Sequence, residues 1–318
     1  MSFCCWTKTS AETTTPVSEQ QASLVRFRGR LPKHLWRRSI LWLTVCEQAL
    51  SVRSVSRSFR ECSNAYMKIF WLRPMACVPQ DASSLERAME LCEHLTAQEE
   101  YVEGTTVVVK LGSGVHEVEG SWAVVGSGTH QKTVSVPCYH LSVVGQGEGE
   151  TTVHGCLVVE NGRKIRVQGL TVKNSSGYGL LASGAGAEMV LWEVTVEECQ
   201  YAGVSVDQGA KFDAKECHFR QNGRNGVKVR GSMTTARLTN CTSHHNKCDG
   251  VVAYSGAVVD LMGAGTSVYD NEEDGLSAWY GDSTINVYQP CVLDDVSHGN
   301  KDKNICMEQG GTVRSQNN

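Results

Sequence analysis

Residues 226–231 read GVKVRG, and residues 250–256 read GVVAYSG. In both runs a glycine is followed by apolar side chains at every second position. A period of two is typical of a β-strand with one buried side, whereas an amphipathic helix needs a period near 3.6. The two runs therefore predict a strand that begins directly after each glycine.

The same unit recurs along the chain. Its glycines are separated by 24, 23, 24 and 25 residues, and they are Gly179, Gly203, Gly226, Gly250 and Gly275. A second apolar series lies nine residues before each of them, at Leu170, Val194, Cys217, Cys241 and Thr266. A further glycine series closes the strand at Gly209, Gly231, Gly256 and Gly281, and an alternating run follows each one. Each repeat thus contains three short strands.

Three strands per repeat of about 24 residues predict a mainly β protein, a right-handed parallel β-helix whose coils stack about 4.8 Å apart. Asn222, Asn246 and Asn271 each stand four residues before their glycine. Asparagine is favoured in turns, and stacked amides can bond one another. We therefore expect a ladder of asparagines along one corner of the β-helix.

Composition excludes several classes of protein. The 318 residues are 41% hydrophobic and 20% charged, which is typical of a globular chain. No uninterrupted apolar run of about 18 residues is present, and residues 1–8 do not resemble a secretory leader, so we expect an intracellular protein, cytoplasmic or nuclear, without a membrane partner. The 14 cysteines include no Cys-x-x-Cys pair, so we interpret most of them as core residues and expect no metal and no cofactor.

Charge divides the chain into segments. Residues 24–73 carry eleven Lys and Arg against two Glu, a net charge of +9. Residues 1–23 carry −1 and are rich in Ser, Thr, Glu and Gln, so residues 74–318 must carry −12 for the total of −4. We predict a flexible tail over 1–23, a helical module over 24–73 and a β-helix domain over 80–318. The acidic body argues against nucleic acid as a partner.

The helical module resembles an F-box. The resemblance extends from Leu31 to Trp71 and rests on a Leu-Pro helix start, apolar side chains at helical spacing, and the run LSVRSVSRSFR at 50–60. It implies docking onto an Skp1-like adaptor of a cullin complex. The residues that it would place at or behind that interface are Leu31, Pro32, Leu35, Ile40, Leu43 and Val55. A helical cap that packs only against the β-helix is the alternative.

The larger domain resembles the pectin-lyase-like β-helix proteins over about residues 83–310. Residues 83–92 combine cap residues with a helical apolar stripe, and strand patterns follow at 106–116 and 141–147. In that family a helix caps the start of the stack. The resemblance implies a fold and does not imply an activity.

One outward row is a candidate ligand site. Asp207, Arg230, Tyr254 and Trp279 each lie four residues after a repeat glycine, so they should form a lateral row that could bind a peptide, a sugar or a protein target. The row lacks paired carboxylates, and we predict no catalytic residue.

Two other clusters are weaker candidates. Asp294 and Asp295 lie in a predicted loop near His298 and have no evident basic partner. His244 and His245 should face opposite sides of a strand, which argues against a shared metal.

Together, the two resemblances point to F-box-only proteins with β-helix repeats. They imply a non-enzymatic adaptor that recognises substrates for an SCF-type cullin-RING ubiquitin ligase. Two alternatives stay open: a polysaccharide lyase or hydrolase that depends on Asp207 or Arg230, and a binding repeat without ligase function.

Overall fold

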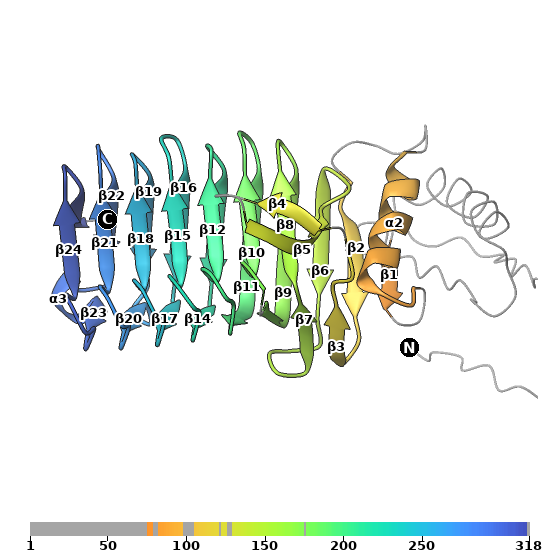
Figure 1. The fold of residues 1–318 in the computed structure, drawn as a ribbon, viewed down its shortest axis with the longest axis horizontal. Coiled ribbons are helices and arrows are strands. Elements are labelled where there is room, and N and C mark those ends of the chain that lie inside the picture. Colours follow the sequence, from red (N-terminus) through yellow and green to blue (C-terminus); the bar gives the residue numbers. More distant parts are fainter. Residues whose placement is uncertain are drawn as a thin grey trace, which may run out of the picture. The chain divides into compact units, whose positions relative to one another are not determined.

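The computed structural model describes residues 75–78, 82–97, 105–120, 122–125, 129–174 and 176–316, which all lie in one compact unit. These residues form the predicted parallel β-helix with three strands per coil (Figure 1). Its first strand, β1 (Met75–Val78), pairs with β2 (Val107–Leu111), so the domain begins before the predicted residue 80. The predicted F-box-like module and its six candidate interface residues lie outside the described residues.

The first face contains the strand that follows each repeat glycine. From one end of the stack to the other it comprises β4 (Trp122–Val125), β5 (Thr129–Ser135), β8 (Cys156–Glu160), β10 (Leu180–Ser183), β12 (Val204–Asp207), β15 (Val227–Arg230), β18 (Val251–Tyr254), β21 (Leu276–Trp279) and β24 (Ile305–Glu308). All neighbours pair in parallel except β4 and β5, which form an antiparallel pair. The departure from parallel pairing therefore occurs at the β4 end of this face, in the early coils.

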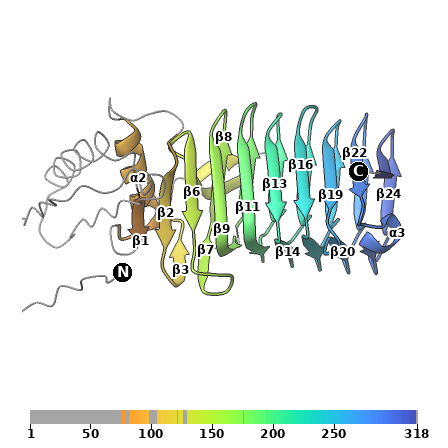
Figure 2. The same cartoon turned by 180° about the vertical axis from the view of Figure 1, so that it is seen from behind.

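The second face is the longest sheet, and Figure 2 shows its strands in order. After β1 and β2 come β6 (His140–Val144), β9 (Lys164–Lys173), β11 (Glu188–Glu197), β13 (Lys211–Lys215), β16 (Thr235–Thr239), β19 (Val258–Met262), β22 (Thr284–Tyr288) and β25 (Thr312–Gln316). The ends of β9 and β11 bend into a third face. Its other strands are β3 (Gly114–Glu117), β7 (Thr151–His154), β14 (His218–Arg220), β17 (Thr242–His244), β20 (Ser267–Tyr269) and β23 (Ser297–His298).

The predicted register is confirmed. Val204 pairs with Val227 and Val227 with Val251, and all three are fully buried. The second apolar series is buried as well, and Phe219 in β14 is among the largest fully buried side chains. Of the nine cysteines whose side chains the structure describes, eight are buried and none forms a disulfide. Burial raises the pKa of most of these thiols, so they pack as small apolar groups.

The asparagine ladder is confirmed and is longer than predicted. Nδ2 of Asn222 donates to Oδ1 of Asn246 (2.9 Å), Nδ2 of Asn246 donates to Oδ1 of Asn271 (2.9 Å), and Nδ2 of Asn271 donates to Oδ1 of Asn300 (2.8 Å). The same oxygens accept backbone N–H groups, as at Asn222 N (3.1 Å). The ladder therefore satisfies buried turn amides on successive coils.

One helix packs at the β1 end of the described stack, and a short one lies at a corner of the late coils. Helix α2 (Leu85–Thr96) lies beside β1 and β2 in both views (Figures 1 and 2), and Oγ of its N-cap Ser84 accepts from Arg87 N (3.2 Å). The helix forms where the apolar stripe at 83–92 predicted one. The four-residue helix α3 (Leu293–Val296) lies near the last coils. No helix in the described ranges combines the length and apolarity that a membrane crossing requires.

Asp249 and Asp274 lie at equivalent positions of successive coils, each directly before a repeat glycine. Oδ2 of Asp249 accepts from Asn225 Nδ2 (3.1 Å), and Oδ1 of Asp249 accepts from the backbone N–H of Asp274 (3.2 Å). Burial, together with the neighbouring carboxylates of Asp274 and Glu273, raises the pKa of Asp249 to about 6 from its ordinary 3.8. Folding therefore favours the protonated form of this group.

This shift predicts a pH-dependent effect of Asp249→Asn. Because the folded pKa is raised, the contribution of Asp249 to stability is present below pH 4 and is lost as the pH rises through 6. At pH 7.5 we expect the free energy of unfolding of the variant to be about 1–2 kcal/mol higher than that of the parent chain. At pH 4 the two values should differ little. Denaturant unfolding at both pH values measures this. The exposed Asp282→Asn is the control, and an equal effect of Asp249→Asn at both pH values would contradict the interpretation.

Candidate functional site

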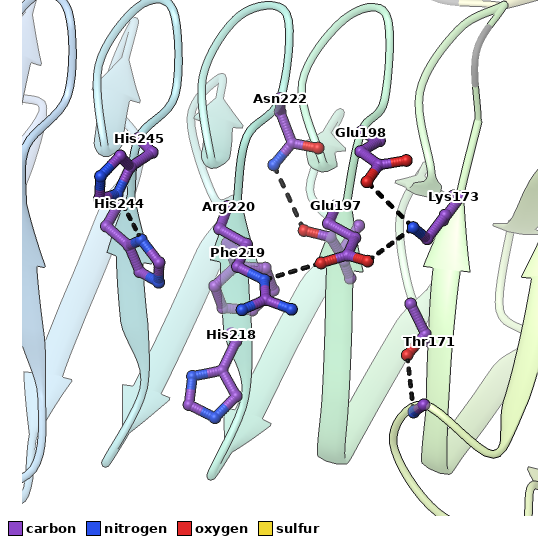
Figure 3. A network of polar contacts seen from close by, with 12 residues as sticks. Thr171, Lys173, Glu197, Glu198, His218, Phe219, Arg220, Asn222, His244 and His245 are labelled. Atoms are coloured by element: carbon purple, nitrogen blue, oxygen red, sulfur yellow. Dashed lines mark hydrogen bonds and ion pairs between the residues drawn. The ribbon is translucent and has the colours of Figure 1, made fainter.

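A straight row of polar side chains follows the outward positions of the third face. Across neighbouring parallel strands, Lys173 pairs with Glu197, Glu197 with Arg220, Arg220 with His244, His244 with Tyr269, and Tyr269 with His298. We call these six residues the third-face ladder. Their neighbours in the strands, such as Phe219, point inward because side chains alternate along a strand. Figure 3 shows the part of the ladder from Lys173 to His244.

Glu197 is the charged centre of the ladder. Its side chain is only 10% exposed, and it accepts from Lys173 Nζ (2.8 Å) and from Arg220 Nε (2.7 Å). Burial opposes its ionisation, but the bonds from Lys173 and Arg220 outweigh burial and lower the pKa of Glu197. Lys173 also contacts Glu198 (3.0 Å). Glu197 is therefore ionised at neutral pH, and both carboxylates neutralise Lys173.

Arg220 keeps part of its hydrogen-bonding capacity. Only its Nε is engaged by Glu197, and among the described residues no acceptor contacts its two Nη groups. The side chain is 43% exposed, and Figure 3 shows the guanidinium between Glu197 and the two histidines His218 and His244. His218 is fixed by its Nδ1 contact with Thr242 Oγ1 (2.8 Å). The guanidinium therefore offers a forked pair of donors to an anionic ligand.

Three rings stack beyond Arg220. The ring of Tyr269 lies parallel to that of His244 (centroids 4.6 Å apart) and to that of His298 (5.4 Å). Because both faces of the Tyr269 ring are covered, it presents its edge and its hydroxyl to a ligand. Burial, with the nearby charges of His245 and Arg220, lowers the pKa of His244 to about 4. His244 is therefore neutral at pH 7 and offers hydrogen bonds rather than charge.

The two adjacent histidines do not both lie on a strand, because β17 ends at His244. His244 Nδ1 and His245 Nδ1 lie 2.8 Å apart, so one ring donates to the other. His245 has a φ of 56°, and this left-handed backbone ends β17 and turns the second ring toward the first. Alternation along a strand no longer applies at that residue. Within the described part of the chain, no group of three or more His, Cys, Asp or Glu side chains could hold a metal ion.

The sequence-predicted row lies on the first face. Asp207 pairs with Arg230, Arg230 with Tyr254, and Tyr254 with Trp279, so the four side chains do form one row. Tyr254 also contacts Tyr280 edge-to-face (5.0 Å between centroids). One atom at each end of the row, Oδ1 of Asp207 and Nε1 of Trp279, is buried without a partner. The binding role of this row stays a prediction.

The third-face ladder was not predicted, although the repeat contains a signal for it. Five of its members lie three residues after the second apolar series, at Lys173, Glu197, Arg220, His244 and Tyr269. Asp294 and Asp295 are exposed and belong to helix α3 rather than to the predicted loop. Their predicted neighbour His298 instead stacks on Tyr269 and completes the ladder.

Comparison with known proteins supports the fold. Residues 150–292 match the family model described as a right handed beta helix region, which agrees with the predicted hand. The chain is similar in structure to pectate lyase Pel9A, with 13% identity and a TM-score of 0.39 over 65% of this chain and 49% of that one. It is also similar to Geobacillus virus E2 ORF18, with 10% identity and a TM-score of 0.38 over 63% and 49%.

A third similar structure is the A-module of the Azotobacter vinelandii mannuronan C-5 epimerase AlgE4, with 14% identity and a TM-score of 0.33 over 66% of this chain and 72% of that one. The chain spans about half the length of the first two structures. No curated protein sequence matches the chain. The family-model match and the parallel strand pairing together define a right-handed parallel β-helix protein.

Proposed function

We propose that the third face binds an extended acidic polysaccharide, a polyuronate, lengthwise along the ladder. The observation that carries this proposal is the half-engaged Arg220 within a straight row of donors and acceptors. Successive coils place ladder residues about 4.8 Å apart. A linear polymer lying along the stack would meet a polar side chain at every coil.

The chemistry of the row suits a chain with both hydroxyl and carboxylate groups. The Nη pair of Arg220 can hold a carboxylate in a forked contact. Hydroxyl groups need donors and acceptors together, and these are supplied by Glu197, by the ring edges of His244 and Tyr269, and by the hydroxyl of Thr242.

Charge favours a polyuronate over a nucleic acid. Lys173 is neutralised by two glutamates, and His244 is neutral at pH 7. Binding of nucleic acid depends on many unneutralised cations along the phosphate backbone. A ladder with Arg220 as its main open cation and with donors and acceptors at its other positions instead matches a polymer whose units carry hydroxyl groups beside one carboxylate.

We propose binding rather than cleavage. The lowered pKa of Glu197 makes it a poor proton donor at neutral pH, and the pKa of His244, about 4, makes it a weak proton acceptor. Uronate bond cleavage needs a general acid or base with a pKa closer to the working pH. Incubation with polygalacturonate should therefore yield neither unsaturated products, which absorb in the ultraviolet, nor new reducing ends.

A matched pair of arginine variants tests the site. Arg220→Gln should weaken calorimetric binding of oligogalacturonate about 10-fold or more, since a charge-assisted contact contributes about 1.5–3 kcal/mol. Arg230→Gln, on the first face, should leave the affinity unchanged. Methyl-esterified galacturonan, which lacks the charge, should bind weakly to the parent chain.

Loss of binding in Arg230→Gln but not in Arg220→Gln would move the site to the first-face row. Arg220→Lys, which keeps the charge without the fork, should show an intermediate loss. Thermal unfolding of each variant separates loss of affinity from loss of fold, because Arg220 also contacts the nearly buried Glu197.

A second candidate function is supported by the sequence motif at 31–71. We propose that this segment docks an Skp1-like adaptor, so that the β-helix would present its ligand to a cullin-RING ubiquitin ligase. Co-purification of the full chain with an Skp1-like protein tests this. The complex should form with the parent chain and should be lost when Leu31 and Pro32 are replaced; no complex with the parent chain would contradict it.

A further inference from the structure

A cavity of about 220 Å³ lies where the third face turns into the first face in the early coils. Polar side chains from β3, β5, β7 and β9 and from the turns that follow β9 and β11 line it, among them Glu117, Lys132, His154, Lys173, Asn174 and Glu198. Pockets for drug-sized ligands span about 300–1,000 Å³. The cavity therefore suits a single unit of about the size of one sugar.

The ladder leads directly into this cavity. Lys173 belongs to both, and register pairs it with His154, which in turn pairs with Glu117. Among the described strands, β3, which carries Glu117, is the last one of the third face at this end. A polymer bound along the ladder would therefore reach the cavity and meet a carboxylate at the final position.

The charges inside the cavity leave one cation open. His154 Nδ1 contacts Glu117 (2.9 Å), and Lys173 is held by Glu197 and Glu198. Lys132 is half-buried, and no acceptor among the described residues contacts its ammonium group. The open ammonium can take an anionic group, while the oxygens of Glu117 and Glu198 can accept from hydroxyls.

From this arrangement we propose that the cavity binds the terminal uronate residue of the polysaccharide, so that the protein recognises chain ends. The inference rests on the proposed function of the ladder. A terminal unit fits better than an internal one because, in the described part of the chain, the third face ends at β3 and offers no further strand for another unit.

The fixed groups of the cavity support recognition of a defined unit. Oδ1 of Asn174 accepts from the backbone N–H of Ser176 (3.1 Å) and from its hydroxyl (2.9 Å), and the Nδ2 group of Asn174 donates to Tyr178 O (2.5 Å). The amide is therefore held in one orientation. A preformed wall of this kind loses little freedom on binding, which favours affinity for a short ligand.

Calorimetry with galacturonate oligomers of increasing length tests the proposal. End recognition predicts one protein bound per oligomer at every length, whereas binding to internal units predicts that the number of proteins per oligomer rises with length. Lys132→Gln should weaken binding of a short oligomer at least 10-fold. The control Lys211→Gln, an exposed lysine on the second face, should match the parent chain.

The outcomes separate this inference from the proposed function. If the number of proteins per oligomer rises with length and Lys132→Gln behaves like Lys211→Gln, end recognition is wrong and ladder binding stands. If the parent chain binds no polyuronate of any length, the proposed function itself is wrong. Thermal unfolding confirms that Lys132→Gln is folded, which we expect because this lysine has no partner among the described residues.

Discussion

Asn246→Ala should lower the free energy of unfolding by about 3–5 kcal/mol, because a fully buried amide with partners on two neighbouring coils is removed. Its Nδ2 donates to Asn271 Oδ1 (2.9 Å) and to the backbone oxygen of Phe219 (3.2 Å), and its Oδ1 accepts from the backbone and side chain of Asn222. Alanine leaves several of these groups buried without a partner, at about 1–3 kcal/mol each.

Asn225→Ala is the matched control for this prediction. Asn225 lies in the equivalent turn of the preceding coil, is only half-buried, and makes one side-chain bond, to Asp249 (3.1 Å). The substitution Asn225→Ala should lower the free energy of unfolding by about 0.5–1.5 kcal/mol. Urea unfolding measures both variants, and equal losses would show that the asparagine ladder does not hold the coils together.

Gly250→Ala should have an effect of similar size for a different reason. A methyl group at this position would overlap Val268 Cγ1 and would lie 2.7 Å from Asn271 Nδ2 and 3.0 Å from the backbone oxygen of Gly275. The neighbours are a core side chain, the asparagine ladder and the next coil, so none can move freely. We expect a loss of about 3 kcal/mol, at the upper end of the usual cost of overpacking.

Gly265→Ala controls for the loss of glycine itself. The nearest atom to its added methyl group would be Asn240 Oδ1 at 3.4 Å, an ordinary contact, and its backbone is not left-handed. The effect should stay within about 0.5 kcal/mol. If Gly250→Ala were tolerated equally well, the repeat glycines would not be required for close approach of the coils.

The repeat pattern in the sequence was sufficient to predict the core. Spacing alone placed Val204, Val227 and Val251 in one inward row, because parallel coils of equal length stack equivalent residues. It also predicted the asparagine ladder at its correct positions. The antiparallel β4–β5 pair and the early strand β1 could not be found in this way, since neither repeats.

Prediction of the site was less complete. The outward positions of the strand after each repeat glycine predict the row from Asp207 to Trp279, which the register confirms as a row. The strand that begins at the second apolar series has the same period, and its outward positions include Lys173, Glu197 and Arg220. The sequence does not show that these side chains bond one another across coils. The contact between His244 and His245 depends on a left-handed residue, and no period predicts such a residue.

Hydroxyl-radical footprinting of the chain with and without polygalacturonate tests the central claim most directly. We expect the ligand to protect His244 and Tyr269 on the third face and to leave Tyr254, Trp279 and Tyr280 as reactive as in the free protein. Protection of the first-face aromatic residues, with Tyr269 unchanged, would contradict it.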